Sequence, residues 1–234
     1  MVCWEYFQNE NFLLTLTFGV YFLARYIQRK VGWAWLNPIL VSIAFLILFL
    51  KLTGVSYETY ERGGAKIDFW LKPAVVALGV PLYRQLVAIK KQILPIVVSQ
   101  IVGCTTGIVS VVLIAKWLGA SQPVILSLVA KSVTTPIAME VTRTLNGIPS
   151  LTAAIVVAVG ILGAIIGFKV LHFGHINHAD SQGLSIGTAS HAVGTSAAMQ
   201  RGEEHGAFAS LGLILNGVFT AVLASVLLRW MDIV

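Results

Sequence analysis

The stretch KSVTTPIAME, residues 131–140, decides the fold because it places a cation, hydroxyl groups, a proline and a carboxylate in an apolar surrounding. Pro136 cannot donate a hydrogen bond to the carbonyl of Ser132, and its ring clashes there, so a helix should be interrupted between Lys131 and Pro136. A charge at bilayer depth costs about 3 kcal/mol or more, and such a residue usually faces a protein interior or an aqueous cavity. The stretch therefore predicts a polar break inside a membrane protein.

The composition places the whole chain in a membrane. Of its 234 residues, 57% are hydrophobic and only 11% are charged, whereas soluble domains carry about 25% charged residues. The net charge of +6 comes from basic residues that lie beside apolar runs, and such a placement sets membrane topology. The sequence contains no nucleic-acid-binding or nucleotide-binding motif, so we expect no nucleic acid and no nucleotide as a partner.

We expect an all-α polytopic membrane protein that forms a single domain, residues 1–234, with about six to eight transmembrane segments. The chain also shows a weak internal repeat, which predicts two structural repeats, 1–117 and 118–234. In each half an interrupted (broken or re-entrant) segment, 67–86 and 183–199, precedes a long apolar helix. Paired interrupted segments of this kind point to the binding site of a secondary transporter.

The number of crossings depends on how the interrupted segments lie. If both cross the bilayer, there are about eight spans, and Arg84, Arg143 and Arg201 all lie in the cytoplasm, as the positive-inside rule favours. If both dip in and return as hairpins, each half has three crossings and the halves are inverted. Residues 53–66 mix charges and tyrosines with a break at Gly63-Gly64 and are predicted to form a solvated loop.

Glycines mark two stretches where we expect close packing. Gly160, Gly163 and Gly167 form a stripe of small residues on one apolar helix. Residues 183–196 contain three more glycines, which disfavour a continuous helix and predict a broken or closely approached backbone.

Three histidines, His172, His175 and His178, recur at a spacing of three residues. Gly174 and Asn177 disfavour the helix that would align them, and no cysteine joins them as a ligand. We therefore expect a solvated loop here and no metal site.

The break before Pro136 has the chemistry of an anion site. A helix that restarts at Pro136, capped by Thr134 or Thr135, presents free N–H groups and the positive end of its dipole to the gap. The ammonium group of Lys131 and the hydroxyl of Ser132 reach the same gap, and together they favour a small carboxylate. The alternative is that Lys131 extends to the membrane interface while Pro136 only kinks the helix.

His191 has two candidate roles, a buried structural histidine or a proton relay, because histidine titrates near neutral pH. Its neighbour Ser190 does not indicate a hydrolase, since adjacent helical side chains diverge by about 100° and the sequence has no nucleophile elbow. We therefore expect neither enzymatic activity nor a cofactor. Glu140 and Arg143 lie three residues apart on one helix face and should pair with each other rather than with a substrate.

The strings KSVTTPIAM (131–139) and GTASHA (187–192), the latter followed by Gly194-Thr195, resemble the LrgB/CidB family, and the similarity covers nearly the whole chain after residue 36. The resemblance implies a multi-pass protein of the bacterial inner membrane, and it implies two functions. Some members are described as holin/antiholin-like regulators of murein hydrolase export and autolysis, which act with a small LrgA/CidA-type membrane partner. Others, among them plastid transporters of glycolate and glycerate, move small monocarboxylates.

Of the two functions, the sequence favours a secondary transporter or facilitator of small monocarboxylates such as glycolate, glycerate, lactate or pyruvate, because a regulator has no need of a lysine beside a proline-broken helix. Lys131 would be the counter-ion of the carboxylate, and His191 a polar contact or proton carrier. We expect the protein to work in the lipid bilayer as a homodimer. The expected substrate site comprises Lys131, Ser132, Thr134, Thr135, Pro136, Gly187, Thr188, Ser190, His191, Gly194 and Thr195.

Overall fold

The computed structural model describes residues 7–32, 36–77 and 79–234. Every regular element within these ranges is an α-helix, as predicted. The chain divides into two compact units, Met1–Ala77 and Leu78–Val234, and each is described by itself.

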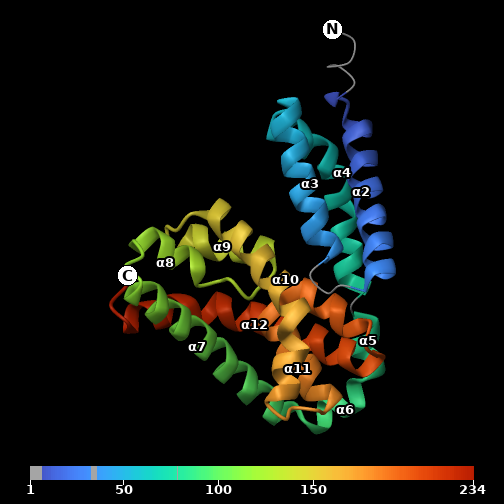
Figure 1. Ribbon diagram of the computed structural model, residues 1–234. Coiled ribbons are helices and arrows are strands. Elements are labelled where there is room, and N and C mark those ends of the chain that lie inside the picture. The colour runs from blue at the N-terminus through green and yellow to red at the C-terminus, as the bar shows by residue number, and fades with distance from the viewer. Residues whose placement is uncertain (1–6, 33–35, 78) are drawn as a thin grey trace. The chain divides into compact units, whose positions relative to one another are not determined.

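The described residues of the first unit form the helices α2 (Glu10–Val31), α3 (Pro38–Thr53) and α4 (Tyr57–Ala77) (Figure 1). The side chain of Asn9 accepts hydrogen bonds from the first turn of α2, and Gly32, with φ of 69°, ends that helix. These caps supply partners for backbone groups that a helix end leaves unpaired.

The prediction of a solvated loop over residues 53–66 is wrong, because most of this segment forms the first half of α4. Its polar residues bind α2: Tyr60 Oη lies 3.0 Å from Thr17 Oγ1, and Lys66 Nζ lies 3.5 Å from Glu10 Oε2. A Cβ atom at Gly63 would lie 2.9 Å from the carbonyl oxygen of Glu10. The glycine therefore allows two helices to approach closely and does not mark a turn.

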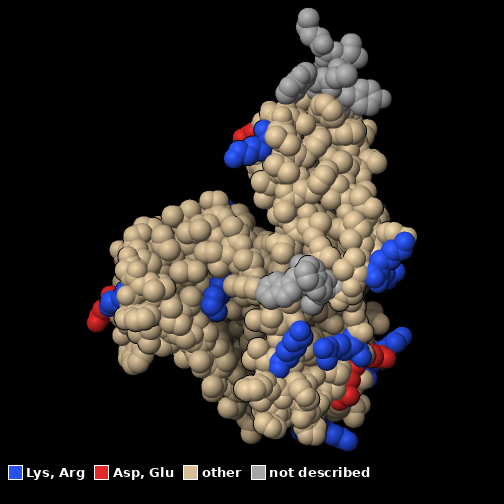
Figure 2. Space-filling model, in the orientation of Figure 1, with Lys and Arg blue, Asp and Glu red and all other residues tan. Residues whose placement is uncertain are grey.

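The second unit contains the remaining helices (Figure 1). These are α5 (Gly79–Arg84), α6 (Leu86–Lys91), α7 (Ile93–Trp117), α8 (Gln122–Leu128), α9 (Thr135–Thr144), α10 (Pro149–Phe173), α11 (Ala179–Met199) and α12 (Glu203–Trp230). Three of the described helices, α7, α10 and α12, are long and apolar enough to cross a bilayer, and α3 is a shorter apolar helix. On the face that Figure 2 shows, most of the surface is uncharged. The chain is thus a membrane protein, whereas the count of six to eight crossings and the repeat remain predictions.

Helices α8 and α9 form a hairpin, called here the first hairpin (residues 121–147), whose tip is the non-helical stretch 129–134. Pro136 lies in the first turn of α9, where its missing N–H costs nothing. The two arms are joined near their base, since Thr152 Oγ1 of α10 lies 2.9 Å from both Ser127 O and Thr142 Oγ1. All three of these hydroxyl-bearing residues are fully buried.

Helix α11 is also interrupted, because Ser190 (φ −129°, ψ 15°) and His191 (φ 42°, ψ −139°) are not helical. The chain turns back at this point. Gly187, before the interruption, and Thr195, after it, both contact the carbonyl oxygen of Ala209 in α12. We call residues 179–199 the second hairpin.

The glycine stripe of α10 is closely packed, as predicted, and its packing partner is the second hairpin. A Cβ atom at Gly163 would overlap the side chain of Ser190, and one at Gly160 would lie 2.5 Å from Cε1 of His191. The absence of a side chain on α10 therefore lets the tip of the second hairpin reach the helix backbone.

The two hairpins approach α10 from opposite ends. The first contacts Thr152 near the start of the helix, and the second packs on Phe168 near its end. Their tips meet at the fully buried Val156, which packs with Val133 of the first tip and accepts a hydrogen bond from Nε2 of His191 in the second at 2.8 Å.

Candidate functional site

A pocket of about 400 Å³ lies between α7, the first hairpin tip, α11 and α12. Polar side chains from all four elements line it. They include Ser99, Gln100, Lys131, Ser132, Thr188 and Asn216. Because these elements belong to distant parts of the sequence, the pocket exists only once the second unit has folded.

Lys131 brings a positive charge to the pocket. Its ammonium group donates to Ser132 Oγ at 3.2 Å. Among the side chains that the structure describes, no carboxylate lies within ion-pair distance of it. A desolvated cation without a protein counter-ion favours an anion from solution.

Asn216 joins the first hairpin tip to α11 at the wall of the pocket. Its Nδ2 donates to the carbonyl oxygen of Ser132 at 3.1 Å and to that of Thr188 at 2.9 Å. Carbonyl oxygens only accept, so these two bonds fix the orientation of the amide. Asn216 is 2% exposed, and its hydrogen bonds hold two backbone segments, at Ser132 and Thr188, that line the pocket.

Gln100 connects α7 to α11 on the other side of the pocket. It is 2% exposed, and its Oε1 accepts a hydrogen bond from Thr188 Oγ1 at 2.8 Å. The NH₂ group of Gln100 has no acceptor among the described residues, so it can donate to a ligand alongside Lys131 and Ser132.

A smaller pocket adjoins the Lys131 pocket near the first residues of α7 and α11. This second pocket, of about 190 Å³, shares Ser99, Ser181 and Leu184 with it and extends to Gln92 and Asp180, beside the first residues of α7 and α11.

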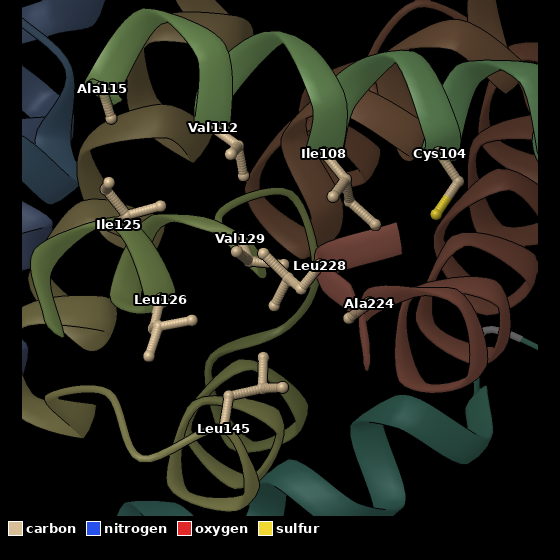
Figure 3. Packing of buried hydrophobic residues seen from close by; sticks show 10 residues of the cluster. All are labelled: Cys104, Ile108, Val112, Ala115, Ile125, Leu126, Val129, Leu145, Ala224 and Leu228. Atoms are coloured by element: carbon tan, nitrogen blue, oxygen red, sulfur yellow. The ribbon is translucent and has the colours of Figure 1, made fainter. Parts of the chain in front are cut away.

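The opposite wall of the pocket is apolar. Cys104, Ile108 and Val129 line the pocket and also belong to the cluster drawn in Figure 3, which continues to Leu145 and Leu228. Side chains from α7, the first hairpin and α12 meet in this cluster. The cluster therefore closes the pocket toward the base of the first hairpin.

The structure divides the predicted substrate site. Lys131, Ser132 and Thr188 line the pocket together. Thr134 is the residue before α9 and makes no capping hydrogen bond with its side chain, and Thr135 and Pro136 form the first turn. These last three residues are not part of the pocket lining.

The predicted residues of the second hairpin have protein partners away from the pocket. His191, 3% exposed, donates from Nε2 to Val156, and Thr195 Oγ1 donates to the carbonyl of His191 at 2.9 Å. Gly187 lies against α12, and Gly194 against the buried Ser190. Their roles toward a substrate remain predictions.

Sequence analysis missed Asn216 and gave Gln100 no role in a site. Each is a single amide side chain within an apolar helix long enough to span a membrane. A polar residue in such a segment usually faces the protein interior and marks a site. This is the pattern that could have identified both.

Two smaller predictions concern side chains outside the pocket. Arg143 and Glu140 form an exposed ion pair, as expected. In the described part of the chain no three potential metal ligands gather, and His172 Nδ1 lies 3.0 Å from Asn177 Oδ1.

Comparison with known proteins identifies the family. The model of the LrgB-like family matches residues 17–230. The chain belongs to the LrgB-like family.

Its relatives match along almost their whole length. YwbG of Bacillus subtilis is 37% identical over 218 residues, which cover 93% of this chain and 97% of YwbG. The holin-like protein CidB of Staphylococcus aureus is 35% identical over 216 residues, 92% of this chain and 94% of CidB. The protein of the same name from Staphylococcus epidermidis is 36% identical over 224 residues, which cover 96% of this chain and 97% of that protein.

No solved structure matches. The name of the two CidB proteins agrees with the holin-like hypothesis better than with the transporter hypothesis.

Proposed function

We propose that this LrgB-like protein acts as a holin-like membrane protein of the bacterial inner membrane that regulates murein hydrolase export and autolysis. The observation that carries the proposal is its similarity to CidB proteins named holin-like, which spans more than nine tenths of the chain. A small LrgA/CidA-type membrane protein would be its partner.

Complementation tests this function. The gene for this chain, with and without that of the partner, would replace cidB in a Staphylococcus aureus deletion strain. The expected result is restored murein hydrolase activity in the culture supernatant, measured by zymography together with the rate of autolysis. If membrane-inserted protein leaves both measurements at the level of the deletion strain, the proposal fails.

The pocket supports a second and more specific function, the passage of small monocarboxylates such as glycolate, lactate or pyruvate. The observation that favours it is Lys131, which lies in a pocket of about 400 Å³ without a described carboxylate partner and beside the hydroxyl of Ser132. Gln100, whose NH₂ group has no acceptor among the described residues, lines the same pocket. A planar anion with two oxygens is the kind of ligand that ammonium, hydroxyl and amide donors favour.

Uptake into proteoliposomes tests the second function. The purified protein, with and without its partner, would be supplied with labelled glycolate, lactate and pyruvate. We expect saturable uptake that Lys131→Ala abolishes and that Lys116→Ala, which removes an exposed lysine of α7, leaves intact. Absence of saturable uptake for all three acids would contradict a carrier, and equal uptake by the Lys131→Ala protein would exclude Lys131 as the counter-ion.

A further inference from the structure

A third pocket, of about 360 Å³, lies where α10 ends and the second hairpin begins and returns. It is lined by Phe168, Lys169, His172, Phe173, Gln182 and Arg201. It shares no lining residue with the Lys131 pocket. The third pocket is therefore a site separate from the Lys131 pocket.

Two cations face this pocket without a counter-ion. Of the described carboxylates, none lies within 4.0 Å of Lys169 or Arg201, and the nearby Glu203 is paired with Arg84 at 3.2 Å. The guanidinium carbon of Arg201 lies 3.9 Å above the centre of the Phe168 ring. Stacking on a ring orients the guanidinium group and leaves its N–H groups free to bind both oxygens of an anion.

The position of the pocket along α10 indicates a ligand at the membrane surface. The helix has 25 residues and is therefore about 37 Å long, which exceeds the hydrocarbon thickness of about 30 Å. Phe173 in its last turn is 87% exposed and Val170 is 60% exposed. An apolar surface thus lies directly beside the two cations, as acyl chains lie beside a phosphate in a lipid.

We propose that this pocket binds the headgroup of an anionic phospholipid, with Arg201 and Lys169 on the phosphate and the exposed side chains Phe173 and Val170 along the acyl chains. Arginine binds a phosphate through two parallel hydrogen bonds, and lysine adds a point charge. Basic pockets between membrane helices are known to hold such headgroups. The proposal does not depend on which of the two functions the Lys131 pocket serves.

Lipid binding to purified protein in detergent tests the proposal. Native mass spectrometry would count bound phosphatidylglycerol and phosphatidylcholine, and thermal unfolding would be followed with each lipid and with inorganic phosphate. We expect retention of phosphatidylglycerol, with a higher unfolding temperature. The variant Lys169→Gln/Arg201→Gln should bind it roughly 30-fold more weakly, because each cation near the membrane surface raises the affinity about fivefold and the two factors multiply.

The matched control is Lys90→Gln/Lys91→Gln, which removes two exposed cations from α6 and should bind phosphatidylglycerol like the wild type. Equal weakening in this control would overturn the proposal, because attraction would then be diffuse. Equal retention of phosphatidylcholine would overturn it as well. If inorganic phosphate stabilises the protein as strongly as phosphatidylglycerol does, the site is one for a free anion and not for a lipid.

Discussion

The two helix interruptions differ in what packs against them. The first, at residues 129–134, lies beside a pocket and presents Lys131 to it. The second, at Ser190 and His191, is filled by the backbone of α10, and both of its residues are buried. The comparison teaches that a broken helix becomes a candidate site only where the neighbouring elements leave space beside it.

The largest effect on stability is expected from a substitution that disrupts the packing of α10 against the second interruption. In Gly163→Ala the new methyl group would overlap the side chain of Ser190, and overpacking of this kind should lower the free energy of unfolding by about 3 kcal/mol. Thermal unfolding in detergent measures it. Gly19→Ala, at a helical glycine with no described atom within 4 Å, serves as the control and should stabilise by about 0.5–1 kcal/mol.

A second substitution makes this prediction specific. Gly163→Ala combined with Ser190→Gly removes the clashing side chain and should recover much of the lost stability. If the double variant is no more stable than Gly163→Ala, the contact between α10 and the second hairpin is not the cause.

The next largest effect concerns the first interruption, which one amide holds in place. Asn216→Ala removes hydrogen bonds to the carbonyls of Ser132 and Thr188 and should cost about 1–3 kcal/mol, since two acceptors lose their donor. Hydrogen exchange of residues 129–134 should rise more than that of residues 190–191. Equal protection in the variant and the wild type would show that the tip is held by other contacts.

Replacement of Lys131 should affect stability less than the two changes above, although it should affect anion binding most. Lys131→Met removes a cation whose described partner is a hydroxyl, so the free energy of unfolding should stay within about 1 kcal/mol of the wild type or rise. Anion binding, followed by calorimetry with lactate or glycolate, should be lost. A strongly destabilised Lys131→Met protein would indicate that the lysine is structural, and the contrast between the two interruptions would disappear.

The smallest effect lies at the far end of α9. Glu140→Gln breaks the ion pair with Arg143, in which both side chains are more than half exposed, and exposed pairs contribute about 0.5 kcal/mol or less. The midpoint of thermal unfolding should therefore hardly change, either in 50 mM salt or in 500 mM salt. The Debye length is roughly 14 Å in the first condition and roughly 4 Å in the second, so the two conditions cover weak and strong screening. A large shift would mean that the pair also supports the first hairpin.

A structural feature could be predicted from the sequence when the residues that cause it are neighbours in the chain. The interruption before Pro136 follows from the proline ring, and the close packing at the α10 glycines follows from their missing side chains. Both features could therefore be predicted from the sequence. Which surface fills the second interruption depends on the fold. For this reason Lys131 and His191, both predicted for one site, lie in different surroundings.

The same limit explains the residues that were misplaced or missed. Residues 57–66 read as a loop because they are polar, yet their partners are on α2, far away in the sequence. Asn216 lies in a long apolar segment, and its importance comes from two carbonyls on other elements. Contacts between distant segments are not encoded in local periodicity.

The size of the Lys131 pocket sets a limit on what it can bind. The pocket holds about 400 Å³, and the adjoining second pocket holds about 190 Å³. A folded domain of 100 residues has a radius of gyration of about 13 Å, so no folded hydrolase fits. The volume of the Lys131 pocket therefore suits small solutes and leaves no room for a folded cell-wall enzyme.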